Sequence, residues 1–239
     1  MVARGLRNVG AARARFRDDE DSGRDGWSVC AADPMKVVAA FPRLRLKPGY
    51  VLRAYQFRSG GNGNAVVWAQ PAGASFPEPD DPAMATNSIG VAGIVLDAPR
   101  PPEAVDDFME AIEGDRSALS FLSASLLWRQ LRELGATWHG EDWSTHALVD
   151  ETLGIPTKRG DYTYHPIDES ELRWDGQRPV DWQPLVEMLQ DGGALVTFYT
   201  RSDLGCCTIY EHRDRFPAHG YVCRSSSEAI ATGPGGFVF

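Results

Sequence analysis

Residues 194–212, with the sequence ALVTFYTRSDLGCCTIYEH, decide the fold class. The segment ALVTFYT is rich in β-branched and aromatic side chains, which favour strands. RSDLG is typical of a turn, and CCTIYEH then predicts a returning strand. Neighbouring residues point to opposite faces of a strand, so Cys206 and Cys207 alone would shape a metal site poorly. This stretch therefore predicts an antiparallel hairpin.

A second hairpin is predicted over residues 50–58 and 65–70, on either side of the loop SGGNGN. Glycine supplies the positive φ angles that such a loop needs. We expect the two hairpins to join one antiparallel sheet. The residues 71–100 that follow are rich in Pro, Asp, Ala and Gly, and predict a surface loop with one embedded strand at GVAGIVL.

Two helices are predicted between the hairpins, at residues 102–113 and 116–134. In the first, apolar side chains recur at the spacing of one helical face, at Val105, Phe108, Met109 and Ile112. In the second, a broad leucine stripe predicts burial, and Gly135 ends the run. The fold class expected is α+β, with an antiparallel sheet built from two or more hairpins and packed against two central helices.

The 239-residue chain is long enough to bury a sizeable core without disulfides or metals. Residues 1–34 resemble a disordered tail, first rich in arginine and then acidic, although an organelle transit segment and a start codon placed too early are alternatives. Residues 35–239 are predicted to form a single α+β domain. We expect deletion of residues 1–30 to leave the melting temperature nearly unchanged.

The charge distribution argues against nucleic acid as a partner of the body of the chain. Residues 1–17 hold five arginines and no acid, and the rest carries 19 basic and 33 acidic side chains, a net charge of -14. Phosphate backbones are normally met by clustered Lys and Arg. No apolar run reaches the roughly 18 residues of a membrane span, and the four cysteines form no Cys-x-x-Cys pair. A soluble, cytoplasmic protein is expected.

The stretch TWHGEDWSTH, residues 137–146, is the first candidate for chemistry. Imidazole and carboxylate are ligands of zinc and iron and also form general acid–base pairs. The candidate catalytic residues are His139, Glu141, Asp142 and His146, with His139 and His146 as candidate metal ligands. The two histidines are seven residues apart and separated by Gly140, so a loop rather than one helix would have to bring them together.

The alternative interpretation is that this stretch only packs. Trp138 and Trp143 would turn inward and anchor it, while the histidines bond to backbone groups. Asp142 or Ser144 would cap a short helix. Packing is favoured because tryptophans are core material far more often than they mark chemistry.

Ligand contacts are predicted around the glycine loop and the second hairpin, at Arg58, Asn62, Asn64 and Arg201. SGGNGN lacks the following helix and the lysine of a phosphate-binding loop, so a plain turn is the better interpretation. A metal set of His212, His219 and Cys223 is conceivable but disfavoured by ligand geometry, because His212 is expected at a strand end and His219 in a proline-containing turn.

Two functions remain open at this point. The first is a non-catalytic protein that binds a protein partner or small ligand through a sheet face or glycine-rich loops. The alternative is a metal-dependent or acid–base hydrolase that uses the cluster from His139 to His146, with Arg58 or Arg201 orienting an anionic substrate. The sequence identifies no cofactor.

Overall fold

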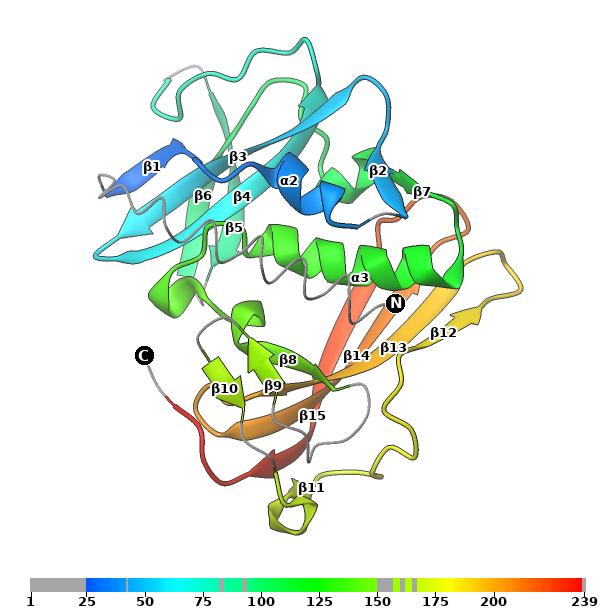
Figure 1. Cartoon of the computed structure of the whole chain (residues 1–239). Helices are drawn as coiled ribbons and strands as arrows, with labels where there is room; N and C mark the ends of the chain where they lie inside the picture. The colour runs from blue at the N-terminus through cyan, green and yellow to red at the C-terminus, as the bar shows by residue number, and fades with distance from the viewer. Residues whose placement is uncertain are drawn as a thin grey trace. The chain divides into compact units, whose positions relative to one another are not determined.

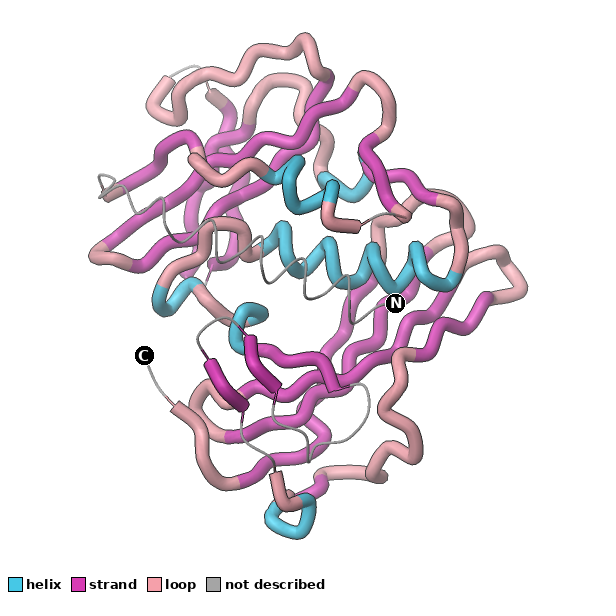
Figure 2. Tube along the Cα trace, in the orientation of Figure 1, coloured by secondary structure: helices cyan, strands magenta, loops and turns pink. Residues whose placement is uncertain are grey.

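The computed structural model describes residues 25–41, 43–81, 84–91, 94–149, 157–159, 162–164 and 167–237. Strands make up most of the regular structure, and the sheets are antiparallel (Figures 1 and 2). The chain divides into two compact units, the first formed by residues 1–141 with 220–222 and the second by residues 142–219 with 223–239. Each unit is described by itself, and the prediction of a single domain over 35–239 stays a prediction.

The described part of the first unit contains a three-stranded sheet, two two-stranded sheets and two α-helices. Its strands are β1 Gly26–Val29, β2 Leu44–Leu46, β3 Tyr50–Ser59, β4 Asn62–Pro71, β5 Ala85–Val91, β6 Ile94–Arg100 and β7 Ile112–Gly114. Its helices are α2 Pro34–Ala39 and α3 Ala118–Arg132, with short 3-10 turns η1 Phe108–Ala111 and η2 Trp138–Gly140. The sheets pair β1 with β3 and β4, β2 with β7, and β5 with β6.

The predicted first hairpin is confirmed as β3 and β4, which pair from Tyr50 opposite Pro71 to Ser59 opposite Asn62. One face of this sheet carries a small aromatic core in which Tyr55, Trp68 and Ala104 are buried. The ring of Tyr55 stacks on Phe76 at 4.4 Å. The apolar alternation of both strands thus places one row of rings against the loops that follow β4.

The tail prediction was wrong for residues 26–34. Residues 26–29 form β1, an edge strand in which Trp27 lies opposite Phe57, with ring centroids 5.3 Å apart. Asp33 then caps α2, its side chain accepting a hydrogen bond from the amide of Met35 at 2.9 Å. The apolar residues Trp27 and Val29 explain the strand, because they alternate within a segment that is otherwise polar. The remainder of the predicted tail, residues 1–24, lies outside the described residues.

Of the two predicted central helices, the structure contains the second. Ser117 caps α3, and the leucines of the predicted stripe at positions 122, 126, 127 and 131 are buried, whereas Leu119 is half-buried. α3 contacts α2, β2 and β4. The helix expected over 102–113 is absent: Asp107 caps the 3-10 turn η1, and Ile112 then pairs with Leu46 in a strand ladder.

The second unit is built on a six-stranded antiparallel sheet. Its strands are β8 His146–Val149, β11 Arg173–Trp174, β12 Leu185–Met188, β13 Ala194–Ser202, β14 Cys207–Phe216 and β15 Arg224–Gly233. A separate two-stranded sheet pairs β9 Thr157–Arg159 with β10 Tyr162–Tyr164, and η3 Trp143–Thr145 and η4 Glu169–Glu171 are 3-10 turns. The main order is β11-β15-β14-β13-β12, and β8 also pairs with β13.

The predicted second hairpin is confirmed as β13 and β14, but it does not share a sheet with the first. β3 and β4 belong to the three-stranded sheet of the first unit, whereas β13 and β14 form the centre of the six-stranded sheet. One face of the latter packs an apolar core that includes Leu172, Trp182 and Ile209. The expectation of one sheet built from both hairpins was therefore wrong.

No helix among the described residues is both long and apolar enough to cross a membrane.

Candidate functional site

The predicted cluster is divided by the boundary between the units, which falls between Glu141 and Asp142. In the first unit, His139 is exposed on η2 and its backbone amide donates to Asn62 Oδ1 at 3.2 Å, while Glu141 is buried. In the second unit, Asp142 and His146 lie together, with Oδ1 and Nε2 3.6 Å apart. Of the four candidate catalytic residues, the structure thus brings together Asp142 and His146.

Trp138 does not turn inward as expected. Its side chain is 61% exposed, whereas that of Trp143 is 8% exposed, so the packing interpretation holds for the second indole only. Backbone contacts explain the difference: Gly63 and Thr137 form a β-bridge, and Gly140 lies so close to Gly63 that a Cβ atom would meet its carbonyl oxygen at 2.0 Å. This tight docking holds Trp138 at a φ of 52°, a region that bulky side chains rarely adopt.

A polar chain runs from the exposed side chain of Asp142 to buried residues of the six-stranded sheet. His146 begins β8 opposite Ser202 of β13, so its side chain shares a face with Thr200. His212 of β14 lies on that same face, opposite Phe198. The Thr200 hydroxyl is 2.7 Å from His146 Nδ1 and 2.7 Å from His212 Nε2.

The Thr200 hydroxyl has a single proton and can donate to only one of the two imidazoles. At the other contact, a ring nitrogen must therefore donate to the Thr200 oxygen. A hydrogen bond from His146 lowers the pKa of Asp142 below its ordinary value.

Aromatic rings enclose the histidines of this chain. The ring of Trp143 stacks on His146 at 5.4 Å, that of Tyr210 lies 4.9 Å from His146, and Phe198 stacks on His212 at 4.7 Å. Thr200 is fully buried, and both nitrogens of His146 face groups of the protein. Since a catalytic hydroxyl or imidazole must reach its substrate, this arrangement favours a structural role.

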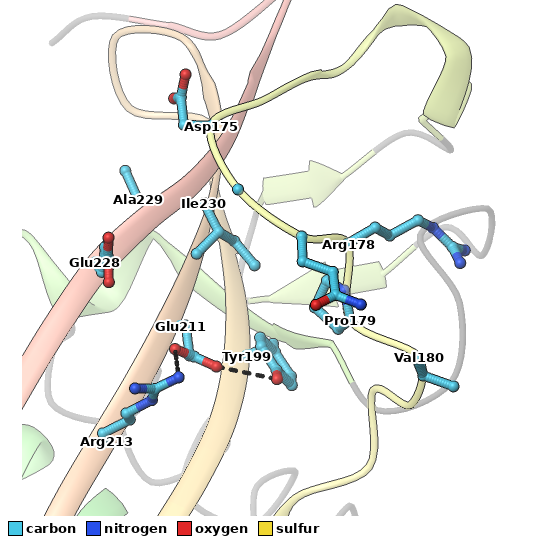
Figure 3. Close-up of a pocket in the computed structure, with 12 residues that line it drawn as sticks. Asp175, Arg178, Pro179, Val180, Tyr199, Glu211, Arg213, Glu228, Ala229 and Ile230 are labelled. Carbon is cyan, nitrogen blue, oxygen red and sulfur yellow. Dashed lines mark hydrogen bonds and ion pairs between the residues drawn. The ribbon is translucent and has the colours of Figure 1, made fainter.

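The opposite face of the same sheet carries a pocket of about 420 Å³ (Figure 3). Its floor is a row across three strands, in which Tyr199 of β13 is paired with Glu211 of β14, and Glu211 with Glu228 of β15. Directly paired residues of an antiparallel sheet project from the same face. The register of the sheet therefore aligns a phenol and two carboxylates along the floor.

Polar contacts fix the floor of the pocket. The Tyr199 hydroxyl donates to Glu211 Oε1 at 3.1 Å, and Arg213 Nη2 lies 2.7 Å from Glu211 Oε2 (Figure 3). Burial, followed by the charge of Glu211, raises the pKa of Tyr199 above its ordinary value. Tyr199 is therefore a neutral hydrogen-bond donor at physiological pH, and Glu211 is held in one orientation.

The segment from Asp175 to Val180 forms the wall of the pocket. Tryptophans flank it: Trp182 packs edge-on against Tyr199 at 5.2 Å, and Trp174 lies 6.2 Å from Trp182. Arg178 of this wall pairs with Glu169 at 2.7 Å. At its end, Val180 is 94% exposed. The wall is thus anchored at both ends and carries an exposed apolar side chain.

The predicted ligand contacts fall in both units. Arg58, Asn62 and Asn64 lie at the turn between β3 and β4, where Asn64 Oδ1 accepts from the Ala65 amide at 2.8 Å. Arg201 lies on β13 of the second unit, and two of its nitrogens contact Asp203 at 2.8 and 2.7 Å. The guanidinium of Arg201 is therefore neutralised by a carboxylate. The assignment of these four residues to a ligand stays a prediction.

The described residues contain no group of three or more His, Cys, Asp or Glu side chains arranged to hold a metal ion. His212 belongs instead to the buried chain with Thr200. The metal pair of His139 and His146 stays a prediction, because its members belong to different units.

Sequence reasoning missed the pocket residues Glu211, Arg213 and Glu228. A signal was present in the second hairpin, where Glu211, Arg213 and Arg215 recur at every second position. Such alternation predicts a polar face, but only the strand register shows that Glu228 joins it.

Comparisons with protein-family models, curated proteins and solved structures found no significant match.

Proposed function

We propose that this chain is a non-catalytic cytoplasmic protein that binds a small polar molecule carrying a protonated amine in the pocket above Tyr199, Glu211 and Glu228. The observation that carries the proposal is the cross-strand row on the pocket floor. Ligand sites are typically concave, with a small number of polar groups that fix orientation. The cytoplasmic location is supported by the four cysteines, all of which are thiols.

The amine preference follows from the charges of the pocket lining. Glu211 and Glu228 are direct cross-strand partners, and like charges in that position are destabilising. Arg213 pairs with Glu211, and Arg178 pairs with Glu169, which lies outside the pocket lining. A bound ammonium group would offset the remaining repulsion between Glu211 and Glu228.

Titration calorimetry with two four-carbon probes of opposite charge tests this proposal. We expect 1,4-diaminobutane to bind with a dissociation constant of about 1 mM or below, and succinate not to bind. Glu228→Gln should weaken diamine binding by about five-fold or more. The control is Glu187→Gln on β12, an exposed glutamate outside the pocket lining, which should bind like the unchanged protein. Equal binding of both probes, or equal loss in both variants, would contradict the proposal.

An acid–base hydrolase is the second candidate, and the 3.6 Å approach of Asp142 to His146 is the observation that favours it. Elemental analysis of protein purified without a histidine tag separates the two candidates. Near-stoichiometric zinc, iron or manganese that disappears in a His139→Ala, His146→Ala double variant would support the enzyme. Metal-free protein whose His146→Ala form only melts earlier would support packing.

A further inference from the structure

The six-stranded sheet ends at β12, and no strand of the described chain pairs with the outer side of β12 (Figure 1). In an antiparallel ladder, alternate residues direct their amide and carbonyl groups to the partner strand. Leu189 N donates to Gly193 O at 2.9 Å, so the backbone groups of Leu189 point toward β13. β12 continues this register, with Met188 opposite Ala194, so the groups of Glu187 and Leu185 point toward β13 as well. The backbone groups of Val186 and Met188 therefore face away from β13.

The edge strand β12 is short, with four residues after Pro184. It has no lysine, the residue that most often blocks a natural edge against added strands, and no Lys or Arg occurs from Pro179 to Thr200. The side chains of Leu185 and Met188 are 54% and 55% exposed. β12 thus presents unpaired backbone groups between two exposed apolar side chains.

The charges near β12 define the kind of partner. Asp181, Glu187 and Asp191 are the only charged residues between positions 179 and 200, and all are acidic. Arg213 and Arg215 of β14 lie two strands away on the face of Glu187, where they pair with Glu211 and Asp191. Of the three, Asp191 pairs with an arginine, Arg215 at 3.4 Å. Glu187 remains on the exposed edge without such a pair among the described residues. A basic strand is therefore complementary, whereas a second copy of this chain would bring a formal charge of -9 against the same charge.

We infer that β12 binds an extended basic peptide by strand addition, with main-chain hydrogen bonds to Val186 and Met188. Leu185 and Glu187 share one face of β12, and Val186 and Met188 share the other. The peptide that fits alternates its side chains accordingly, with Lys or Arg on the face of Glu187 and apolar residues on the face of Met188. In such recognition the main chain supplies affinity and alternate side chains supply specificity.

Fluorescence anisotropy of a labelled seven-residue peptide that alternates Lys and Val tests the inference on the full chain. We expect saturable binding of this peptide and none of the matched Glu–Val peptide. Val186→Pro should weaken binding by about ten-fold or more, because proline removes an outward N–H while the bonds between β12 and β13 remain. Val186→Ala, which keeps that N–H, is the matched control and should stay within about three-fold.

A second variant and a second measurement complete the test. Glu187→Lys leaves the backbone intact and should also weaken the Lys–Val peptide by about ten-fold, so the inference is tested even if Val186→Pro fails to fold. Sedimentation of the protein alone tests whether a second copy of the chain occupies the β12 edge. We expect no dimer that is lost in Val186→Pro. Equal binding of both peptides, unchanged binding in Glu187→Lys, or a dimer abolished by Val186→Pro would overturn the inference.

Discussion

Thr200 shows how one hydroxyl can link two histidine side chains. It lies between His146 and His212 in a fully buried position, where an unpaired nitrogen would be costly. The sequence marked His146 as a candidate for chemistry, but His212 was expected in a strand end and Thr200 was not considered. Neither could be found from spacing, since residues 146, 200 and 212 meet only through the pairing of β8, β13 and β14.

Thr200→Val is expected to lower the free energy of unfolding by about 1–3 kcal/mol, because an isosteric methyl leaves two buried imidazole nitrogens without their partner. Urea denaturation followed by circular dichroism measures the change. Thr197→Val, on the opposite face of β13, is the control and should shift stability by less than about 0.5 kcal/mol. Equal effects of the two substitutions would show that the buried chain adds no stability.

Cys206 and Cys207 are expected to differ in reactivity, as neighbours on opposite faces of the chain. Cys206 is exposed, whereas burial raises the pKa of Cys207 to about 11. At pH 8 roughly one Cys207 in a thousand is then a thiolate, the reactive form. Brief alkylation with iodoacetamide followed by peptide mass spectrometry should modify Cys206 and spare Cys207. In urea both should react, and early modification of Cys207 in native protein would contradict its burial.

At the scale of elements, the two long hairpins were predictable from the sequence, whereas short strands and 3-10 turns were not. β3, β4, β13 and β14 follow from alternation and turn residues, which are local signals. The helix expected over 102–113 failed because Val105, Phe108, Met109 and Ile112 match a helical face by spacing alone. In the structure Glu103 has a φ of 59°, which interrupts a helix, and Ile112 pairs with Leu46 instead. Non-local pairing thus overrode the local pattern.

β1 changes what we expect of an N-terminal deletion. A chain that begins at Ala31 loses the pairing of β1 with β3 and the contact of Trp27 with Phe57, whereas one that begins at Asp25 keeps both. The shorter chain should melt roughly 5 °C below the longer one, as a loss of about 2 kcal/mol implies at this size. Differential scanning calorimetry checks the difference. Equal melting temperatures would restore the expectation that residues 1–30 are dispensable.

At the scale of the whole molecule, the sequence predicted one sheet from both hairpins, whereas the described residues form several sheets. Both hairpins have the same pattern of strand, Arg-Ser, glycine-containing loop and strand, so nothing local distinguishes their sheets. They nevertheless belong to separate sheets in separate units. The pocket was beyond prediction for the same reason. Its floor and wall come from residues 175–180, 199, 211, 213 and 228–230, and only the fold brings them together.

The formal charge of -9 and a pI of about 5.0 predict how the protein behaves in solution. Repulsion between copies vanishes near the pI, so solubility should fall to a minimum near pH 5 and recover at pH 7. Light scattering across this range at low ionic strength measures the effect. Aggregation that is instead greatest at pH 7 would indicate that an exposed apolar surface, rather than net charge, controls association.

The outward indole of Trp138 gives the protein a built-in optical reporter. All seven tryptophans lie in the described part of the chain, and Trp138 alone is exposed. Iodide should therefore quench Trp138 most strongly, Trp27, Trp128 and Trp174 less because they are half-buried, and the three buried tryptophans least. Any molecule that settles over the glycine loop beside Trp138 would shield its indole, so binding there can be followed without a label.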